Sequence, residues 1–151
     1  MKRALIALAI LVVALGGWCT VRRLFADDEA AIRAAIEDMR TAAEAKDVGR
    51  FMSHVSGDYQ DDSQNNAFII RQMIMRVLTG FDSLKVHVED VRVTVTGDTA
   101  YATMNVTTEA VRNGKLENPF GSDQAPERPR VTFKKDGEWK IVKVDGVQGS
   151  Y

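Results

Sequence analysis

The sequence predicts an α+β domain in which helices cover a curved antiparallel sheet, with a membrane-spanning helix before the domain. Residues 84–111 read as two long strands that fold back on each other at Thr96-Gly97-Asp98-Thr99. Helical segments with one apolar face precede them, and an antiparallel sheet commonly packs one face against such a cover. The chain opens with an apolar stretch long enough for a bilayer.

The apolar stretch runs without a charge from Ala4 to Val21, which is 18 residues. As a helix it would extend about 27 Å, close to the thickness of the bilayer's hydrocarbon core. An uncleaved anchor is the favoured interpretation, and a cleaved signal segment is the alternative. Lipoprotein modification at Cys19 is disfavoured, because Trp18 and not a small residue precedes it. The chain therefore divides into an anchor or signal segment, residues 1–26, and a domain, residues 27–151.

Basic residues flank both ends of this stretch, with a slight excess at the N-terminus, which favours a cytoplasmic N-terminus. We expect a bacterial inner-membrane protein with its domain on the periplasmic side, or a secreted or periplasmic protein after cleavage. The domain itself has 16 basic and 21 acidic residues, since four of the 20 basic residues precede Asp27. It lacks the basic surface that binding to nucleic acid requires.

Three helices are expected before the strands. The first covers Glu29 to about Lys46, where Ile32, Ile36 and Met39 recur at helical spacing. Their side chains lie on one face, so this helix is expected to pack on the sheet.

Two cap residues mark the next helices. Asp47 is expected to cap a short second helix, and Asn66 a third helix over residues 67–79 that stops at Gly80. Residues 59–66 between them are expected to form a short edge strand that runs into a loop.

The first long strand carries an irregularity. Apolar residues fall on even positions over residues 84–88 and on odd positions over residues 91–95. Since side chains change face at every residue, this shift predicts a β-bulge at Glu89-Asp90. A bulge bends its strand, so we expect a concave sheet.

The last part of the chain is expected to complete the sheet. Residues 113–129 contain all three prolines and few apolar residues, and predict a long exposed connection. Two strands follow, over residues 130–135 and 138–145, joined by a hairpin turn at Asp136-Gly137.

With this order of elements the chain resembles the nuclear transport factor 2-like superfamily, the cone fold of ketosteroid isomerase-like proteins. The resemblance covers nearly all of residues 27–151. It implies a curved sheet around a pocket, frequently a homodimer through the sheet, and in some members an isomerase, dehydratase or hydrolase. The residues that carry it are the first helix with Asp47-Val48, the turn at residues 56–59, residues 91–102 and residues 137–142.

Tyr59, Asp61 and His54 are the candidate catalytic residues. A carboxylate base in an apolar pocket would have a raised pKa, and a tyrosine could donate a hydrogen bond to an oxyanion. A packing or capping role for Tyr59 and His54, and solvation of Asp61 and Asp62, are the favoured interpretations.

Methionine side chains and aromatic rings would suit a pocket for an adaptable apolar ligand, but core filling is the favoured interpretation. Polar residues on the other face of the long strands suggest an interface. No metal site or cofactor is expected, because two separate histidines and one cysteine give no ligand spacing. The pocket set is Met39, Met52, Tyr59, Met73, Met104 and Trp139, and the interface set is Arg92, Tyr101, Thr103 and Asn105.

Three functional hypotheses remain. The favoured one is a membrane-tethered, non-catalytic module that binds a small apolar ligand or a partner protein. The second is an isomerase or dehydratase that uses Tyr59 with Asp61 or Asp62. The third is a domain that serves homodimerisation alone.

Overall fold

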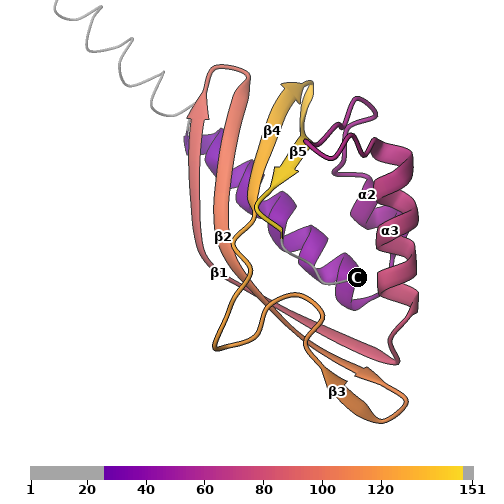
Figure 1. Ribbon diagram of the computed structural model, residues 1–151. Coiled ribbons are helices and arrows are strands. Elements are labelled where there is room, and N and C mark those ends of the chain that lie inside the picture. The colour runs from indigo at the N-terminus through magenta and orange to yellow at the C-terminus, as the bar shows by residue number, and fades with distance from the viewer. Residues whose placement is uncertain (1–25, 148–151) are drawn as a thin grey trace, which may run out of the picture.

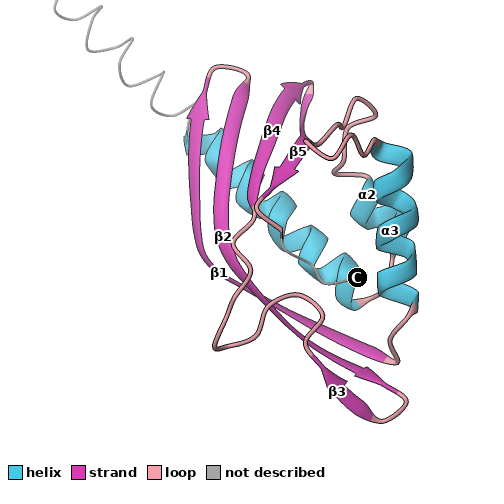
Figure 2. Ribbon diagram, in the orientation of Figure 1, coloured by secondary structure: helices cyan, strands magenta, loops and turns pink. Residues whose placement is uncertain are grey.

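A computed structural model describes residues 26–147 as a bent antiparallel sheet with helices on its inner side (Figure 1). Three helices come first: residues 26–44, α2 (Val48–Met52) and α3 (Ala67–Thr79). Five strands follow, and the sheet order is β1-β2-β4-β5, with β3 paired to β2. Figure 2 shows the helices in cyan and the strands in magenta. The strand bounds are β1 (Ser83–Thr96), β2 (Thr99–Arg112), β3 (Lys115–Glu117), β4 (Arg130–Asp136) and β5 (Glu138–Asp145).

The predicted helices are confirmed. The first helix buries one face against the sheet, where Ile32 and Ile36 join a core cluster with Phe133 and Trp139. Helices of this kind are stabilised mainly by burial of their apolar face. The side chain of Asp47 caps α2 by accepting from the backbone N–H of Arg50.

Asn66 caps α3 as expected, because its Oδ1 accepts from the backbone N–H of Ile69 at 3.0 Å. Gly80 ends the helix with φ −78°, so it stops α3 without the left-handed conformation that glycine often supplies at this position. Leu78 near this end packs with Phe81, Leu84 and Ala43 in a second core cluster.

The bulge in β1 is also confirmed. Glu89 pairs with Asn105 and Arg92 with Thr103, so two residues of β1 face one residue of β2. Asp90 has φ 53°, and its Oδ2 accepts from the side-chain amide of Asn105 at 2.8 Å. The strand pair bends, as Figure 1 shows for β1 and β2, and its lower half swings under α3.

Both outer strands of the sheet have contacts with the helices or the segments that follow them. On β1, Arg33 donates to the carbonyl of Val91 at 2.9 Å and Glu44 accepts from the N–H of Val86 at 3.0 Å. On β5, the carbonyl of His54 accepts from the N–H of Ile141 at 2.8 Å. These contacts satisfy some of the backbone groups that an edge strand would otherwise expose.

Two expectations about the connections were wrong. Residues 59–66 form a loop with one isolated bridge between Gln60 and Asn66, and not a strand. Residues 113–129 are not simply an exposed connection, because they include β3 and fold back onto β2. Val106 and Glu127 exchange two backbone hydrogen bonds at 2.8 and 2.9 Å. This pairing uses backbone N–H and carbonyl groups. The expectation rested on the low apolar content of the side chains, which gives no information about backbone pairing.

Among residues 26–147, no helix is long and apolar enough to cross a membrane. The predicted membrane segment, residues 4–21, lies outside the described residues.

Candidate functional site

A cavity of about 530 Å³ lies between the helices and the inner face of the bent sheet. Its volume is in the range of small-molecule sites in proteins. The first helix contributes Met39 and Ala43, and α3 contributes the largest share of apolar side chains. The remaining apolar lining comes from α2, the strands and the loop after β3. The α3 residues are Ile70, Met73, Ile74, Val77 and Leu78, and the others include Phe51, Val55, Leu84, Val86, Val106, Phe120, Ile141 and Val144.

The cavity has an apolar interior and a polar mouth. Ala43, Leu78 and Leu84 are buried, whereas the lining residues Asp62 and Ser63 are exposed. The mouth therefore lies between the loop before α3 and the end of β5, which approach each other in Figure 1.

Asp61 is the carboxylate at the centre of this mouth, and it is held by its own loop. Its oxygens accept from the backbone N–H and the side-chain amide of Asn65, both at 2.9 Å. They also accept from the N–H of Ser63 and, at 3.4 Å, from the hydroxyl of Tyr59. Four donors match the four lone-pair positions of a carboxylate, so Asp61 has little capacity left to accept a proton from a ligand.

The pKa of Asp61 supports this view. Burial alone would raise the pKa, but the hydrogen bonds from Asn65, Ser63 and Tyr59 bring it below its usual value. A base is most effective when its pKa lies near the working pH, so this carboxylate is a weak general base.

Tyr59 is almost fully buried, and its hydroxyl has both roles taken. It donates to Asp61 and accepts from the backbone N–H of Val144. Burial raises the pKa of the phenol, and the negative charge of Asp61 raises it further. The hydroxyl is therefore neutral and directs its proton away from the cavity's contents.

A second set of charges flanks the mouth. Lys143 pairs with Asp62 at 2.7 Å and with Asp145 at 3.0 Å. The hydrogen bond from Lys143 lowers the pKa of Asp62, and the bond to Asp62 raises the pKa of Lys143.

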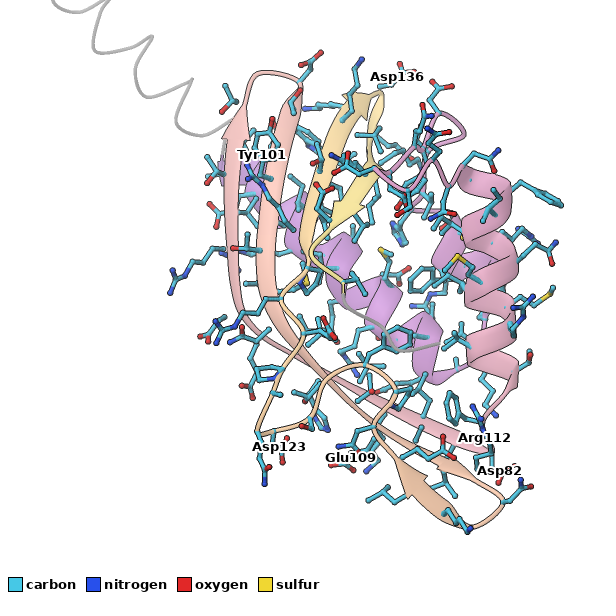
Figure 3. All side chains as sticks on the ribbon, in the orientation of Figure 1. Asp82, Tyr101, Glu109, Arg112, Asp123 and Asp136 are labelled. Atoms are coloured by element: carbon cyan, nitrogen blue, oxygen red, sulfur yellow. The ribbon has the colours of Figure 1, made fainter. Side chains whose placement is uncertain are left out.

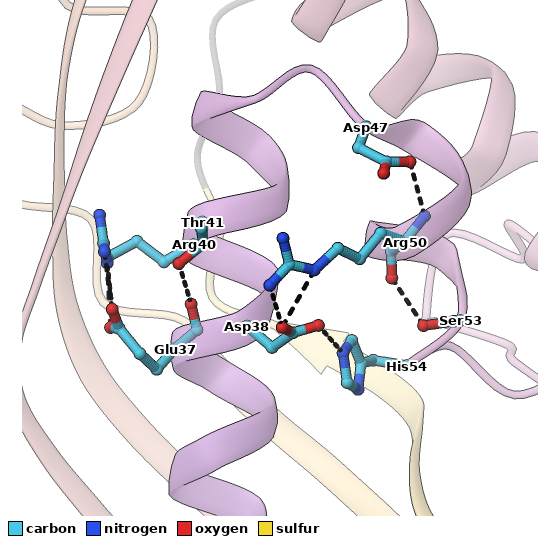
Figure 4. Close-up of polar contacts among 8 residues, drawn as sticks. All are labelled: Glu37, Asp38, Arg40, Thr41, Asp47, Arg50, Ser53 and His54. Atoms are coloured by element: carbon cyan, nitrogen blue, oxygen red, sulfur yellow. Dashed lines mark hydrogen bonds and ion pairs between the residues drawn. The ribbon is translucent and has the colours of Figure 1, made fainter.

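His54 is not part of the cavity lining. Figure 4 shows its ring against Asp38 of the first helix, with Nε2 2.7 Å from Oδ2 of Asp38. Arg50 binds the other oxygen of the same carboxylate. The hydrogen bonds from Arg50 and His54 lower the pKa of Asp38 to about 2. This cluster links the first helix to α2, and the three candidate catalytic residues therefore do not meet at one point.

The expected pocket residues divide into two groups. Met39, Tyr59 and Met73 line the cavity, whereas Met52, Met104 and Trp139 do not. Met104 is buried in the core beneath the first helix. The indole of Trp139 donates to Asp28 at 2.9 Å, which fixes the start of that helix to β5.

The expected interface residues lie on the opposite face of the sheet. Tyr101 is 38% exposed, and Arg130 lies over its ring at 4.7 Å from the centroid. A second hollow, of about 450 Å³, opens on this face between the strands and the loop after β3. Its exposed, charged lining makes it a weaker candidate than the apolar cavity. It is lined by His87, Glu89, Asn105, Thr107, Glu109, Asp123 and Pro126.

No cluster of three or more potential metal ligands occurs among residues 26–147.

Comparison with known proteins agrees with this architecture. The sequence matches the SnoaL-like domain over residues 32–146, and the chain belongs to that family. Its fold is that of the nuclear transport factor 2-like (NTF2-like) proteins. No curated protein matches the sequence.

Several solved structures share the fold at low sequence identity. An NTF2-like protein with a cystatin-like fold from Novosphingobium aromaticivorans is 20% identical, with a TM-score of 0.66, and the match covers 83% of this chain and 84% of that one. A provisionally assigned scytalone dehydratase from the same organism is 12% identical, with a TM-score of 0.64 and coverage of 82% and 84%. Bd1075 from Bdellovibrio bacteriovorus is 13% identical with a TM-score of 0.62, and the match covers 79% of this chain and only 40% of that one. At such identities the likeness concerns the fold alone.

Sequence reasoning missed several residues at the mouth. Asn65 and Asp145 were not among the candidates, and Phe120 was assigned to an exposed connection. Asn65 follows Asp61 by four residues in a polar loop, which is the one local signal for their hydrogen bonds. Nothing in the sequence places Asp145 beside that loop, because strand pairing brings them together.

Proposed function

We propose that this protein is a non-catalytic binding module whose cavity takes a small apolar molecule. The observation that carries the proposal is the cavity of about 530 Å³ with a mainly apolar lining. The polar groups at its mouth are already engaged with one another, as the contacts of Asp61 and Tyr59 illustrate. Burial of apolar ligand surface would supply most of the affinity.

The expected membrane attachment forms part of this proposal. Residues 4–21 would tether the domain to a bacterial inner membrane, with the cavity on the periplasmic side. The length and apolarity of that stretch, and the charges around it, support this arrangement.

An isomerase or dehydratase is the second candidate. The contact of Tyr59 with Asp61 at the cavity mouth favours it. Its weakness is chemical: the carboxylate has a lowered pKa, and the phenol proton is directed at that carboxylate and not at a substrate oxygen.

A homodimer through the outer face of the sheet remains a further proposal. The exposed Tyr101 with Arg130 over its ring supports it. Sedimentation of the full chain that showed a monomer over a wide concentration range would argue against it.

The binding proposal can be tested with N-phenylnaphthylamine, a neutral probe whose fluorescence rises in apolar surroundings. Ile74 lines the cavity, whereas its neighbour Met75 is exposed on α3. Ile74→Trp should fill the space and weaken probe binding at least about tenfold, and Met75→Trp should leave it within about twofold. Equal affinity of the two variants would contradict the proposal.

A further inference from the structure

Building on the proposed function, we infer that the ligand of this cavity has a cationic head group, a protonated amine on an apolar body, and that the cavity discriminates against carboxylates. The inference concerns the chemical class of the ligand. It rests on the charge and hydrogen-bonding capacity of the mouth.

The charged residues that line the cavity all have the same sign. They are Asp61, Asp62 and Asp145, and among residues 26–147 no lysine, arginine or histidine lines it. Lys143 is the cation that contacts these carboxylates in the described part of the chain, and it pairs with Asp62 and Asp145. Three carboxylates and one ammonium group leave the mouth with a formal charge of −2.

Two neutral groups at the mouth direct hydrogen bonds at Asp61. The side-chain amide of Asn65 donates one of its two N–H groups to Asp61, which fixes the orientation of this side chain. The hydroxyl proton of Tyr59 is also directed at Asp61. The carboxylate oxygens of Asp62 and Asp145 are the acceptors that the mouth offers, which suits a ligand that donates hydrogen bonds.

Asp61 contributes charge more than direct contact. Its hydrogen bonds come from neutral donors, which stabilise the carboxylate without cancelling its negative charge. Asp62 and Asp145 share one lysine, so each retains oxygen atoms for an incoming ammonium group. A carboxylate ligand would instead meet two uncompensated negative charges at the opening, and like charges oppose binding.

Three probes with one apolar body isolate the head group: naphthylmethylamine, naphthylmethanol and naphthoate. Binding to the full chain is measured by calorimetry at neutral pH and low salt. The amine should bind roughly three- to tenfold more tightly than the alcohol, and the carboxylate should bind more weakly than the alcohol. Added salt should reduce both differences, because it screens the charges at the mouth.

The double variant Asp62→Asn/Asp145→Asn should bring the affinities of the amine and the alcohol within about twofold. The matched control Glu109→Gln/Asp123→Asn removes the same charge from the other hollow, and it should keep the preference for the amine. Figure 3 labels Glu109 and Asp123 near the lower loop, on the side of the sheet away from α3. If the first variant does not fold, the salt dependence of the unmodified chain still tests the inference.

Different experimental results would overturn the proposed binding function and the inferred class of ligand. Naphthoate binding as tightly as the amine would overturn the inference on ligand class and leave the apolar cavity as a binding site. An amine preference that persisted at high salt would also overturn it. Failure of all three probes to bind would overturn the proposed function, and this inference with it.

Discussion

Two half-buried carboxylates of the first helix connect this helix to other elements of the fold. The carboxylate of Asp28, in the first helix, accepts hydrogen bonds from Trp139 of β5 and Lys135 of β4. The carboxylate of Asp38, in the same helix, forms an ion pair with Arg50 and a hydrogen bond with His54. Each contact joins this helix to a different neighbour. Strong acid and base pairs in this fold therefore do not by themselves indicate catalysis.

The contribution of Asp28 to folding stability should depend on pH. Hydrogen bonds from Lys135 and Trp139 lower its pKa in the folded chain. The stability that this ionised carboxylate contributes is therefore present above its unfolded pKa of about 4, and is lost as pH falls through the lower, folded value.

We expect Asp28→Asn to reduce the free energy of unfolding by about 0.5–1 kcal/mol at neutral pH. The difference from the unmodified chain should shrink toward zero below about pH 3. Urea unfolding at several pH values measures it, with the exposed Asp123→Asn as a control. A difference that stays constant on acidification would contradict the assigned cause.

Tyr59→Phe separates packing from binding. Loss of the hydroxyl removes a long hydrogen bond to Asp61 and the acceptor for Val144, so stability should fall by about 1 kcal/mol. The affinity for N-phenylnaphthylamine should stay within about twofold, because this hydroxyl is not directed at the ligand. Urea unfolding and a probe titration give the two values. A large loss of affinity with unchanged stability would instead support a direct role in the site.

At the scale of elements, the bulge in β1 gives the sheet its bend. Asp90 occupies the left-handed region with φ 53°, which β-branched residues strongly disfavour. Its side chain also accepts from Asn105. The backbone requirement and the side-chain contact can be separated by two substitutions at this position.

We expect Asp90→Val to lower the free energy of unfolding by about 1–2 kcal/mol, and Asp90→Gly to change it by less than about 0.5 kcal/mol. Glu89→Val, one residue earlier on the same strand, should be nearly neutral because the strand there is regular. Urea midpoints measure all three. Similar losses for both valine variants would contradict the assignment of a strained position.

The loop after β3 has its own critical position. Gly121 and Gly114 both have positive φ, 65° and 74°, but a Cβ at Gly121 would lie 2.4 Å from the Val106 oxygen and 2.6 Å from the Glu127 nitrogen. A Cβ at Gly114 would meet nothing within 4 Å. Gly121→Ala must therefore separate the loop from β2.

Gly114→Ala should cost about 1 kcal/mol of stability from backbone strain alone. Gly121→Ala should cost roughly 2–4 kcal/mol and should also weaken probe binding, since the adjacent Phe120 lines the cavity. Thermal unfolding and probe titration compare the two. Equal effects would show that the loop does not need this close approach.

These elements also show what the sequence can and cannot predict. The change of phase at Glu89-Asp90 predicted the bulge, because alternation is a local property of one strand. The caps Asp47 and Asn66 were likewise local signals. The pairing of Val106 with Glu127 uses backbone groups far apart in the sequence, and no side-chain pattern announces it.

Thr108 illustrates the same limit inside a correctly predicted strand. It is a buried polar residue on the apolar face of β2, and its hydroxyl exchanges hydrogen bonds with the backbone of Phe120. The composition of the mouth was equally hidden, since Asp61 and Asp145 meet through folding. Their joint charge could be read only from the structure.

At the scale of the molecule, the bend of the sheet and the position of α3 together enclose the cavity. The bulge turns the lower part of the sheet under α3, and residues of both core clusters line the cavity. The cavity is thus a consequence of the fold and not of one residue. Its mouth carries the negative charge, and its interior is apolar.

The methionines offer the most direct measurement of this central claim. Met39 and Met73 line the cavity, Met75 is exposed on α3, and Met104 is buried outside the cavity. The full chain with ¹³C-labelled methionine methyl groups would be titrated with N-phenylnaphthylamine and followed by NMR. The account predicts saturable shifts for the methyl groups of Met39 and Met73, while those of Met75 and Met104 stay nearly unchanged. Shifts confined to Met75, or of similar size for all four methyl groups, would contradict it.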